Sequence, residues 1–176
     1  MSRPAPNHER QRAAYLITFV CYGSWLHGRE GAVDREHNLV GSPTLAEDPV
    51  VLTRKRRLMT QAPYHLDEYR RAAALRGIIE ACSRRGWILL AAHIRTSHVH
   101  AVVEADRSPE QVMLALKAYA SRALNEAGLD ATDRRRWARH GSTRYLWTAA
   151  EITAAVHYVV NDQGDAMAVY VPEAAR

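Results

Sequence analysis

The fold of this chain is decided by residues 87–104, which read WILLAAHIRTSHVHAVVE. Residues 87–93 and 98–104 are rich in the aliphatic and β-branched residues that are typical of buried strands. The polar residues 95–97 between them are few enough for a tight turn. The sequence therefore predicts a β-hairpin at the centre of the chain.

The second strand of this hairpin carries His98 and His100. Side chains at positions i and i+2 of a strand share one face, and paired neutral imidazoles are common ligands of a divalent metal. In a chain with nine histidines this spacing can also arise by chance, and the two residues can be ordinary hydrogen-bonding strand residues. Other parts of the sequence are needed to choose between metal ligands and ordinary strand histidines.

Helices and strands are expected on both sides of the hairpin. Apolar residues recur at helical spacing before it, and Ser108 and Thr148 each begin a capping box after it. The expected elements are strands at 15–22 and 144–147 and helices at 66–85, 109–126 and 149–163.

This order of elements predicts an α+β fold. An antiparallel sheet with the helices packed on one face is the simplest way to bury the apolar sides of these elements. Residues 25–64 contain several glycines and prolines and follow no period, so we expect a long irregular connection there. No internal repeat is present.

Length and composition are typical of one globular domain. We expect this domain at residues 12–170, between a flexible N-terminal segment at 1–11 and a flexible tail at 171–176. No apolar run approaches the roughly 18 residues of a membrane span, so a cytoplasmic protein without membrane contact is expected. Cys21 and Cys82 are expected to be buried, reduced thiols.

The chain is basic, with a net charge of +5 that comes almost entirely from arginine. The guanidinium group binds phosphate oxygens in a bidentate manner, so nucleic acid is one candidate partner, although a compositional bias toward arginine would give the same balance. The basic run at residues 54–57 is either a DNA contact or a solvated helical turn.

The last predicted helix places a tyrosine beside its buried stripe. The stripe consists of Ile152, Ala155, Val156 and Val159. At 100° per residue Tyr158 lies on the flank of this stripe, and Asp162 lies one turn later under the same flank. Gln163 falls back onto the stripe. The helical phase therefore lets Tyr158 and Asp162 face one site together.

Several segments resemble a known family. The strand YLITFVCYGSWLHG, the hairpin HIRTSHVHAVV and the later segments LKAYASRALNEAG, HGSTRYLWT and AAVHYVVNDQG are similar to the single-tyrosine HUH transposases, which comprise insertion-sequence transposases and REP-associated tyrosine transposases. The likeness extends over most of the chain. It implies a ferredoxin-like palm, in agreement with the predicted order of elements.

The resemblance also implies an activity and a set of site residues. The activity is metal-dependent cleavage and rejoining of single-stranded DNA, often at hairpins, through a 5′-phosphotyrosine intermediate. His98 and His100 match the paired ligands of Mg²⁺ or Mn²⁺, and Tyr158 matches the nucleophile. The family often has an amide ligand four residues after this tyrosine. Here Asp162 holds that position, and Gln163 beside it is the alternative third ligand.

Other residues compete for roles in this site. Tyr119 is a rival nucleophile, but its helical face is apolar and favours a place in the core. His93 is expected to be structural. Backbone-phosphate contacts and base stacking are candidate roles for Arg54, Arg56, Arg95, Lys117, Arg136, Arg139, Arg144 and Trp137.

Two other functions remain open. One is a catalytically silent DNA-binding or regulatory protein derived from such a transposase, and the other is a metal-dependent phosphoesterase for a small nucleotide. The intact set of His98, His100 and Tyr158 favours the active transposase over the silent protein. The resemblance allows a homodimer as well as a monomer.

Overall fold

The computed structural model describes residues 12–24, 50, 53–54 and 57–172. Arg56, most of the irregular connection and both terminal segments therefore lie largely or wholly outside the described residues, so the boundaries of the domain stay a prediction. The elements in chain order are β1 (Ala13–Cys21), α2 (Glu68–Arg85), β2 (Ile88–Ile94), β3 (His98–Ala105), α3 (Pro109–Glu126), β4 (Trp137–Leu146), α4 (Ala149–Asn161) and β5 (Ala168–Tyr170).

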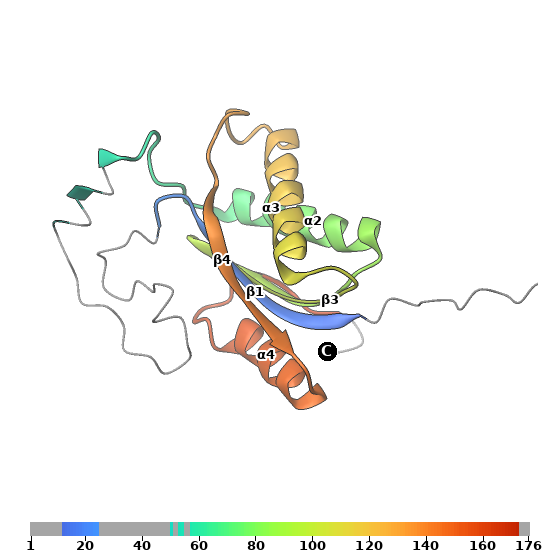
Figure 1. Cartoon of the computed structure of the whole chain (residues 1–176). Helices are drawn as coiled ribbons and strands as arrows, with labels where there is room; N and C mark the ends of the chain where they lie inside the picture. Colours follow the sequence, from blue (N-terminus) through green and yellow to red (C-terminus); the bar gives the residue numbers. More distant parts are fainter. Residues whose placement is uncertain (1–11, 25–49, 51–52, 55–56, 173–176) are drawn as a thin grey trace, which may run out of the picture.

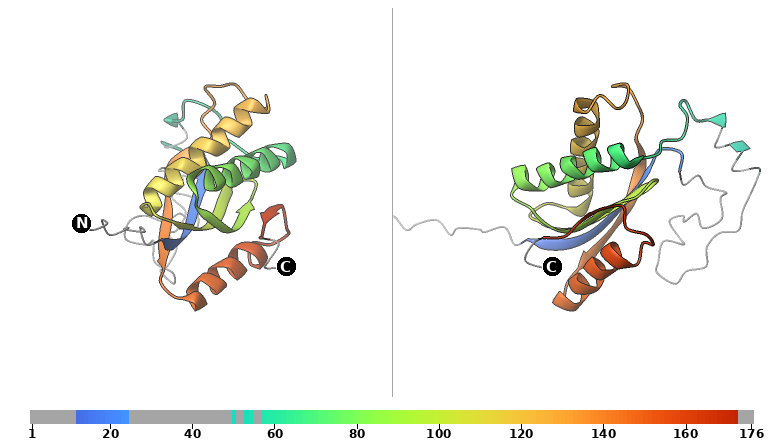
Figure 2. Two further views of the ribbon diagram at one scale, coloured as in Figure 1. Left: turned by 90° about the vertical axis from the view of Figure 1, so that its right-hand side faces the viewer. Right: turned by 180° about the vertical axis from the view of Figure 1, so that it is seen from behind.

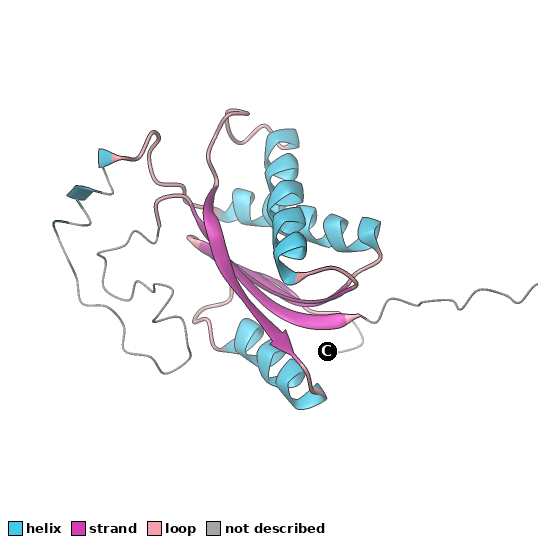
Figure 3. Ribbon diagram, in the orientation of Figure 1, coloured by secondary structure: helices cyan, strands magenta, loops and turns pink. Residues whose placement is uncertain are grey.

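The strands form one antiparallel sheet in the order β4-β1-β3-β2-β5 (Figures 1 and 3). The first six elements follow the pattern βαββαβ, and four of their strands lie in the order 4-1-3-2, which is the ferredoxin-like arrangement. The predicted α+β class, antiparallel sheet and central hairpin are therefore confirmed.

The helices do not all lie on one face of the sheet, as the sequence had suggested. Helices α2 and α3 cover one face, while α4 lies against the other (Figures 1 and 2). The physical reason is that the sheet has apolar side chains on both faces, because Ala91 and Val102 point away from α2 and α3. Helix α4 removes this second apolar face from water.

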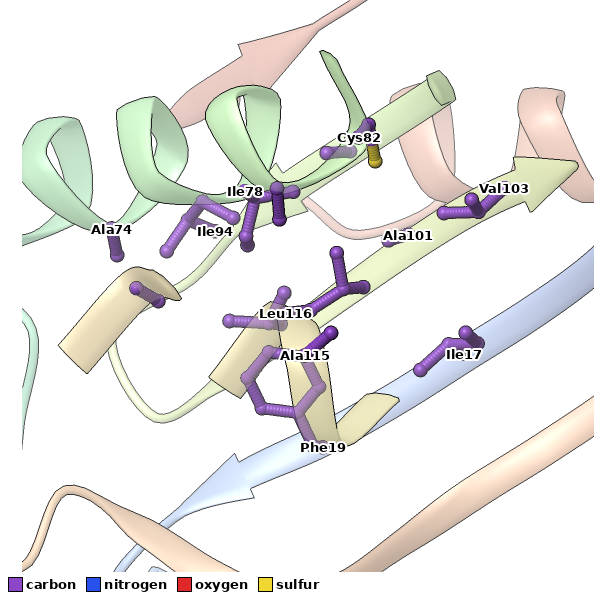
Figure 4. Packing of buried hydrophobic residues seen from close by; sticks show 14 of the residues in the cluster. Ile17, Phe19, Ala74, Ile78, Cys82, Ile94, Ala101, Val103, Ala115 and Leu116 are labelled. Atoms are coloured by element: carbon purple, nitrogen blue, oxygen red, sulfur yellow. The ribbon is translucent and has the colours of Figure 1, made fainter. Parts of the chain in front are cut away.

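The larger core fills the space between the sheet and helices α2 and α3 (Figure 4). Ile17 and Phe19 of β1 and Val99 and Val103 of β3 are completely buried there. At roughly 25 cal/mol per Å² of apolar surface, side chains of this size each contribute about 1.5 to 3 kcal/mol when they are buried. Because alternate residues of β3 fill this core, the residues between them must point to the opposite face of the sheet.

The smaller core lies between the sheet and α4. Ala155 and Val159 of α4 are buried against Val102 of β3 and Leu146 of β4, and Ile152 and Val156 pack at its edge. The predicted stripe of this helix is thus confirmed. Helix α4 also begins at the predicted capping box, in which Thr148 and Glu151 bond each other's backbone amides.

Two strands differ from the prediction. Strand β4 begins at Trp137, seven residues earlier than expected, because most of this edge strand is exposed and shows no alternation of apolar residues. Strand β5 has three residues and adds to the edge of β2.

Within the described part of the chain, no helix is long and apolar enough to cross a membrane.

Helices α2 and α3 approach each other closely at Gly77. A Cβ atom on Gly77 would lie 2.5 Å from the carbonyl oxygen of Tyr119 and 2.8 Å from the Cα atom of Ala120. Both are backbone atoms of α3, so a rotamer change cannot relieve the overlap.

We therefore expect Gly77→Ala to lower the free energy of unfolding by about 1 to 3 kcal/mol, although alanine is the better helix former. Urea unfolding followed by circular dichroism measures the effect. The exposed neighbour Arg76 supplies the control, since Arg76→Ala should change the stability by less than about 0.5 kcal/mol. A Gly77→Ala variant as stable as the wild type would contradict the close approach of the helices.

Candidate active site

His98 and His100 lie side by side on β3, the central strand of the sheet. Their ring centroids are 4.8 Å apart, and the rings meet edge to face at 76°. Both side chains occupy the face of the sheet that α4 covers, because the alternate residues Val99 and Ala101 fill the larger core. The fold thus brings the two imidazoles together as the spacing predicted.

Hydroxyl groups orient both rings. Thr18 of β1 is the direct partner of His100 in the sheet, and its Oγ1 lies 2.7 Å from Nδ1 of His100. Oγ of Ser97 lies 3.1 Å from Nδ1 of His98. When each Nδ1 carries the proton and donates it to the hydroxyl, each Nε2 keeps a lone pair for another ligand.

Burial keeps both imidazoles neutral. Removal from water, together with the neighbouring His98, lowers the pKa of His100 to about 4. Burial also lowers the pKa of His98, with a further contribution from the positive charge of Arg95. Near neutral pH both rings are therefore in the uncharged form, which is the form that coordinates a metal.

Tyr158 lies against this pair. Its ring centroid is 5.6 Å from that of His100, at an interplanar angle of 74°, and its side chain is 41% exposed. The tyrosine comes from the last turns of α4, and Val159 beside it anchors the helix in the smaller core. A nucleophile at this position would be next to the histidines and still open to a large substrate.

Gln163, rather than Asp162, approaches the two histidines. The side chain of Gln163 forms hydrogen bonds that raise the pKa of His98 and of His100, while Asp162 lies 3.3 Å from Nδ1 of the exposed His157. Within the described residues, no group of three or more His, Cys, Asp or Glu side chains is placed to hold a metal.

The structure therefore places Asp162 beside His157 and not beside the pair, unlike the helical-phase prediction, because the helix ends here. Helix α4 ends at Asn161, and Asp162 is its C-cap, so Gln163 no longer follows the rotation of 100° per residue. Nε2 of Gln163 donates to the carbonyl oxygen of Tyr158 at 3.2 Å. This bond leaves the amide oxygen as the end that can face the imidazoles.

His93 has a structural role, as expected. It is completely buried on β2 beside His100. Its Nδ1 lies 3.0 Å from the carbonyl oxygen of Val159, and its Nε2 accepts from the backbone N–H of Met167 at 3.2 Å. Because backbone groups use both nitrogens, His93 fastens α4 and the segment before β5 to the sheet.

Tyr119, the rival nucleophile, is far from this arrangement in the fold. It lies on α3, on the opposite face of the sheet, where it packs against the larger core. The guanidinium carbon of Arg122 lies 4.3 Å from its ring centroid. The structure therefore separates Tyr119 from the histidines and leaves Tyr158 as the tyrosine next to them.

Arg136 was a candidate DNA contact, but it belongs to a buried ionic cluster. Its Nε lies 3.0 Å from Oδ2 of Asp130, and its Nη2 donates to Oδ1 of Asn125 at 2.6 Å. Arg70 binds the other oxygen of Asp130, and the hydroxyl of Tyr64 donates to Oδ2 of Asp130 at 2.6 Å. The guanidinium group of Arg136 is thus used within the protein.

Lys117 and Trp137 are also occupied inside the fold. The ammonium group of Lys117 is buried and donates to the carbonyl oxygens of Ala138, Arg139 and His140 at the start of β4. Nε1 of Trp137 donates to the carbonyl oxygen of Lys117 and to Ser121, and its ring meets that of Phe19 edge to face at 5.0 Å, so this indole is tied into the fold. Both residues hold β4 against α3, and their predicted contact with DNA stays a prediction.

Three other predicted cations are exposed in the described part of the chain. Arg54 is exposed on the described part of the basic run, and Arg139 and Arg144 are exposed on the edge strand β4. Arg95 lies at the hairpin turn, where its guanidinium donates to the carbonyl oxygen of Asp165 and its charge acts on His98 and His100. Arg95 is therefore the predicted cation that is electrostatically linked to the site.

Sequence reasoning missed Thr18 and Ser97, which orient the imidazoles. Ser97 is adjacent to His98, so the stretch Thr96-Ser97-His98 was a usable signal. Nothing in the sequence places Thr18 beside His100, because they are 82 residues apart and meet only through the register of β1 and β3.

Comparisons with known proteins give little further information. No protein-family model and no curated protein matches the chain. Among solved structures, the chain is similar to a REP-associated tyrosine transposase bound to a REP hairpin, at 11% sequence identity and a TM-score of 0.47. The similarity covers 92% of this chain and 72% of that one.

The cluster around Asp130 makes a prediction about acid stability. Burial alone would raise the pKa of Asp130, but hydrogen bonds from Tyr64, Arg136 and Arg70 outweigh it and hold the pKa below its ordinary value. A carboxylate with a depressed pKa stabilises the fold above about pH 4, and this contribution is lost as the pH falls through the pKa of the folded state.

We expect Asp130→Asn to lower the free energy of unfolding at pH 7 by about 3 to 5 kcal/mol, because Arg136 would remain buried without its counter-charge. The variant should also lose less stability than the wild type when the pH is lowered from 6 to 3. Urea unfolding at several pH values measures both effects. Asp133→Asn, at an exposed aspartate nearby, is the control, and equal effects of the two substitutions would refute the role of the cluster.

Proposed function

We propose that this chain is a metal-dependent single-stranded DNA endonuclease and strand transferase in which Tyr158 is the nucleophile. The single observation that carries the proposal is the packing of the Tyr158 ring against His100, 5.6 Å away, beside the His98 and His100 pair. A tyrosine and two histidines thus meet although they come from separate elements, the end of α4 and β3.

The donor set fits a divalent cation such as Mg²⁺ or Mn²⁺. His98 and His100 would supply imidazole nitrogens, and Gln163 would supply an amide oxygen of the kind that Mg²⁺ and Mn²⁺ bind. The hydroxyls of Ser97 and Thr18 already hold the opposite ring nitrogens. A divalent ion with open coordination positions would polarise the scissile phosphate and offset the charge on the leaving oxygen.

Tyr158 would carry out the covalent step. Its phenol oxygen attacks phosphorus, the bond between phosphorus and the 3′ oxygen breaks, and the proton lost by the phenol is balanced by the proton that the 3′ oxygen gains. The products are a 5′-phosphotyrosine and a free 3′ hydroxyl. Attack of a 3′ hydroxyl on this linkage reverses the step and joins strands, so no external energy source is needed.

The exposure of Tyr158 suits a polymeric substrate better than a small nucleotide. The tyrosine is 41% exposed, and Arg95 lies at the same end of the hairpin as the histidines. We propose single-stranded DNA with hairpins as the partner and the cytoplasm as the place of action, with no role for a membrane. A catalytically silent DNA-binding protein is the alternative that the following experiment separates.

Tyr158→Phe should abolish a covalent protein–DNA adduct, because phenylalanine lacks the attacking oxygen. The measurement uses end-labelled, hairpin-bearing single-stranded DNA with Mn²⁺, followed by denaturing electrophoresis. Tyr119→Phe is the matched control and should retain the adduct, since Tyr119 lies on the opposite face of the sheet.

Two outcomes would oppose this assignment. An adduct that persists in Tyr158→Phe but disappears in Tyr119→Phe would exchange the roles of the two tyrosines. Tight hairpin binding by the wild type without any adduct would support the silent regulatory protein.

His98→Ala and Gln163→Ala should each lower Mn²⁺-dependent cleavage by at least about 10-fold while they change DNA binding much less. Asp162→Ala is the control, because Asp162 contacts His157 instead of the pair. Cleavage and binding are measured on the same DNA, and the affinity for Mn²⁺ is measured by titration calorimetry. Equal losses of cleavage and binding in His98→Ala would indicate that the histidines only maintain the structure. A loss of cleavage in Asp162→Ala, with none in Gln163→Ala, would indicate that the carboxylate of Asp162 is the third ligand.

A further inference from the structure

Trp147 presents its indole to solvent at the end of the edge strand β4. Its side chain is 74% exposed, which is unusual for the largest apolar side chain in a folded domain. The indole nevertheless has a defined position, because it stacks on the ring of Tyr145 with centroids 5.0 Å apart and planes within 7° of parallel. The exposed ring is therefore held in one orientation.

The backbone of Trp147 is hydrogen-bonded to the start of α4. Its backbone N–H donates at 2.8 Å to Oε2 of Glu151, the residue whose side chain also closes the capping box with Thr148. A large apolar residue before an N-cap commonly packs on the fourth residue of the helix, which here is Ile152. Such packing would bury the indole, whereas most of its surface lies in water. Helix capping thus fixes the backbone of Trp147 without accounting for its side chain.

The stack continues into the protein. Tyr145 meets Tyr15 edge to face at 5.0 Å, and Tyr15 is buried with its hydroxyl bonded to the carbonyl oxygen of Arg107. Tyr15, Tyr145 and Trp147 form an aromatic ladder whose inner end is anchored and whose outer end is open. The outer side chain has little conformational entropy to lose when a flat ligand binds it.

The chemistry near the ladder favours a nucleobase over a protein or lipid surface. Exposed Arg144 precedes the ladder on β4, and Glu151 follows it, so the indole is not the centre of a wide apolar patch. Every base has a flat face that stacks on an aromatic ring, and a nearby arginine can bind the phosphate of the same nucleotide.

We propose that Trp147 is a stacking platform for an unpaired base of single-stranded DNA. This inference rests on the proposed function and extends it, because it adds a second contact for the strand whose phosphate lies at Tyr158. Trp147 lies two residues before α4 begins at Ala149, and Tyr158 lies in the last turns of α4, so most of the length of this helix separates the two residues. Because Tyr15, the inner end of the ladder, belongs to the larger core, a DNA strand that contacts both Tyr158 and Trp147 would pass around the open edge of the sheet at β4.

The test is the affinity for a labelled single-stranded oligonucleotide, measured by fluorescence anisotropy. Trp147→Ala should raise the dissociation constant by roughly 5- to 100-fold, the range found for the loss of one base–aromatic stack. Trp147→Phe should retain part of the affinity because it keeps an aromatic ring. Leu114→Ala removes an exposed apolar side chain from α3 and should leave the affinity unchanged. Urea unfolding of each variant shows that the fold is intact.

A series of oligonucleotides with single abasic positions makes the test specific. In the wild type one abasic position should weaken binding about as much as Trp147→Ala does, and in Trp147→Ala the same position should cause no further loss. Two results would overturn the stacking platform. One is equal affinity of the wild type and Trp147→Ala, and the other is a Trp147→Ala substitution that weakens binding to every abasic oligonucleotide as much as binding to intact DNA.

The adduct assay at saturating DNA separates the two proposals. Trp147→Ala should still form the Tyr158 adduct there, because the indole only binds the strand. If the wild type forms no adduct but Trp147→Ala still weakens DNA binding, the proposed cleavage activity is refuted and the stacking platform stands.

Discussion

The structure depends on the burial of β3 on both of its faces. Val99, Ala101 and Val103 must face α2 and α3, so the alternation of side chains along a strand forces His98 and His100 to the other face. A slip of one residue in the register of β3 would place both imidazoles in the apolar core and Val99 beside α4. The hydrophobic core therefore sets the position of the candidate site.

Three histidines share this face of the sheet, and their hydrogen bonds give them different roles. Backbone groups of α4 and of the segment before β5 occupy both nitrogens of His93, which makes it a structural clamp. Hydroxyls hold one nitrogen of His98 and one of His100, and a hydrogen bond with Gln163 opposes the lowering of the pKa of both rings by burial. Since His93 attaches α4 to the sheet, it also holds Tyr158 near His100.

The sequence predicted the features that depend on short-range patterns. The hairpin with its histidine pair, the capping boxes and the buried stripe of α4 all follow from local periodicity. It failed where a residue's environment depends on distant contacts. Nothing local marks Arg136 as the partner of a buried Asp130 while Arg144 stays exposed, and the exposed residues of β4 show no strand pattern.

Gln163 lies near the histidines where helical periodicity had favoured Asp162, which shows that this periodicity cannot be extended past the end of a helix. The carbonyl oxygen of Tyr158 accepts from the backbone N–H of Asp162 and from the side chain of Gln163. Tyr158 therefore fixes both the end of α4 and the direction of the Gln163 side-chain amide. Because these two bonds converge on Tyr158, its placement and that of Gln163 are coupled. A change in the length of α4 would move the nucleophile and the amide away from the histidines together.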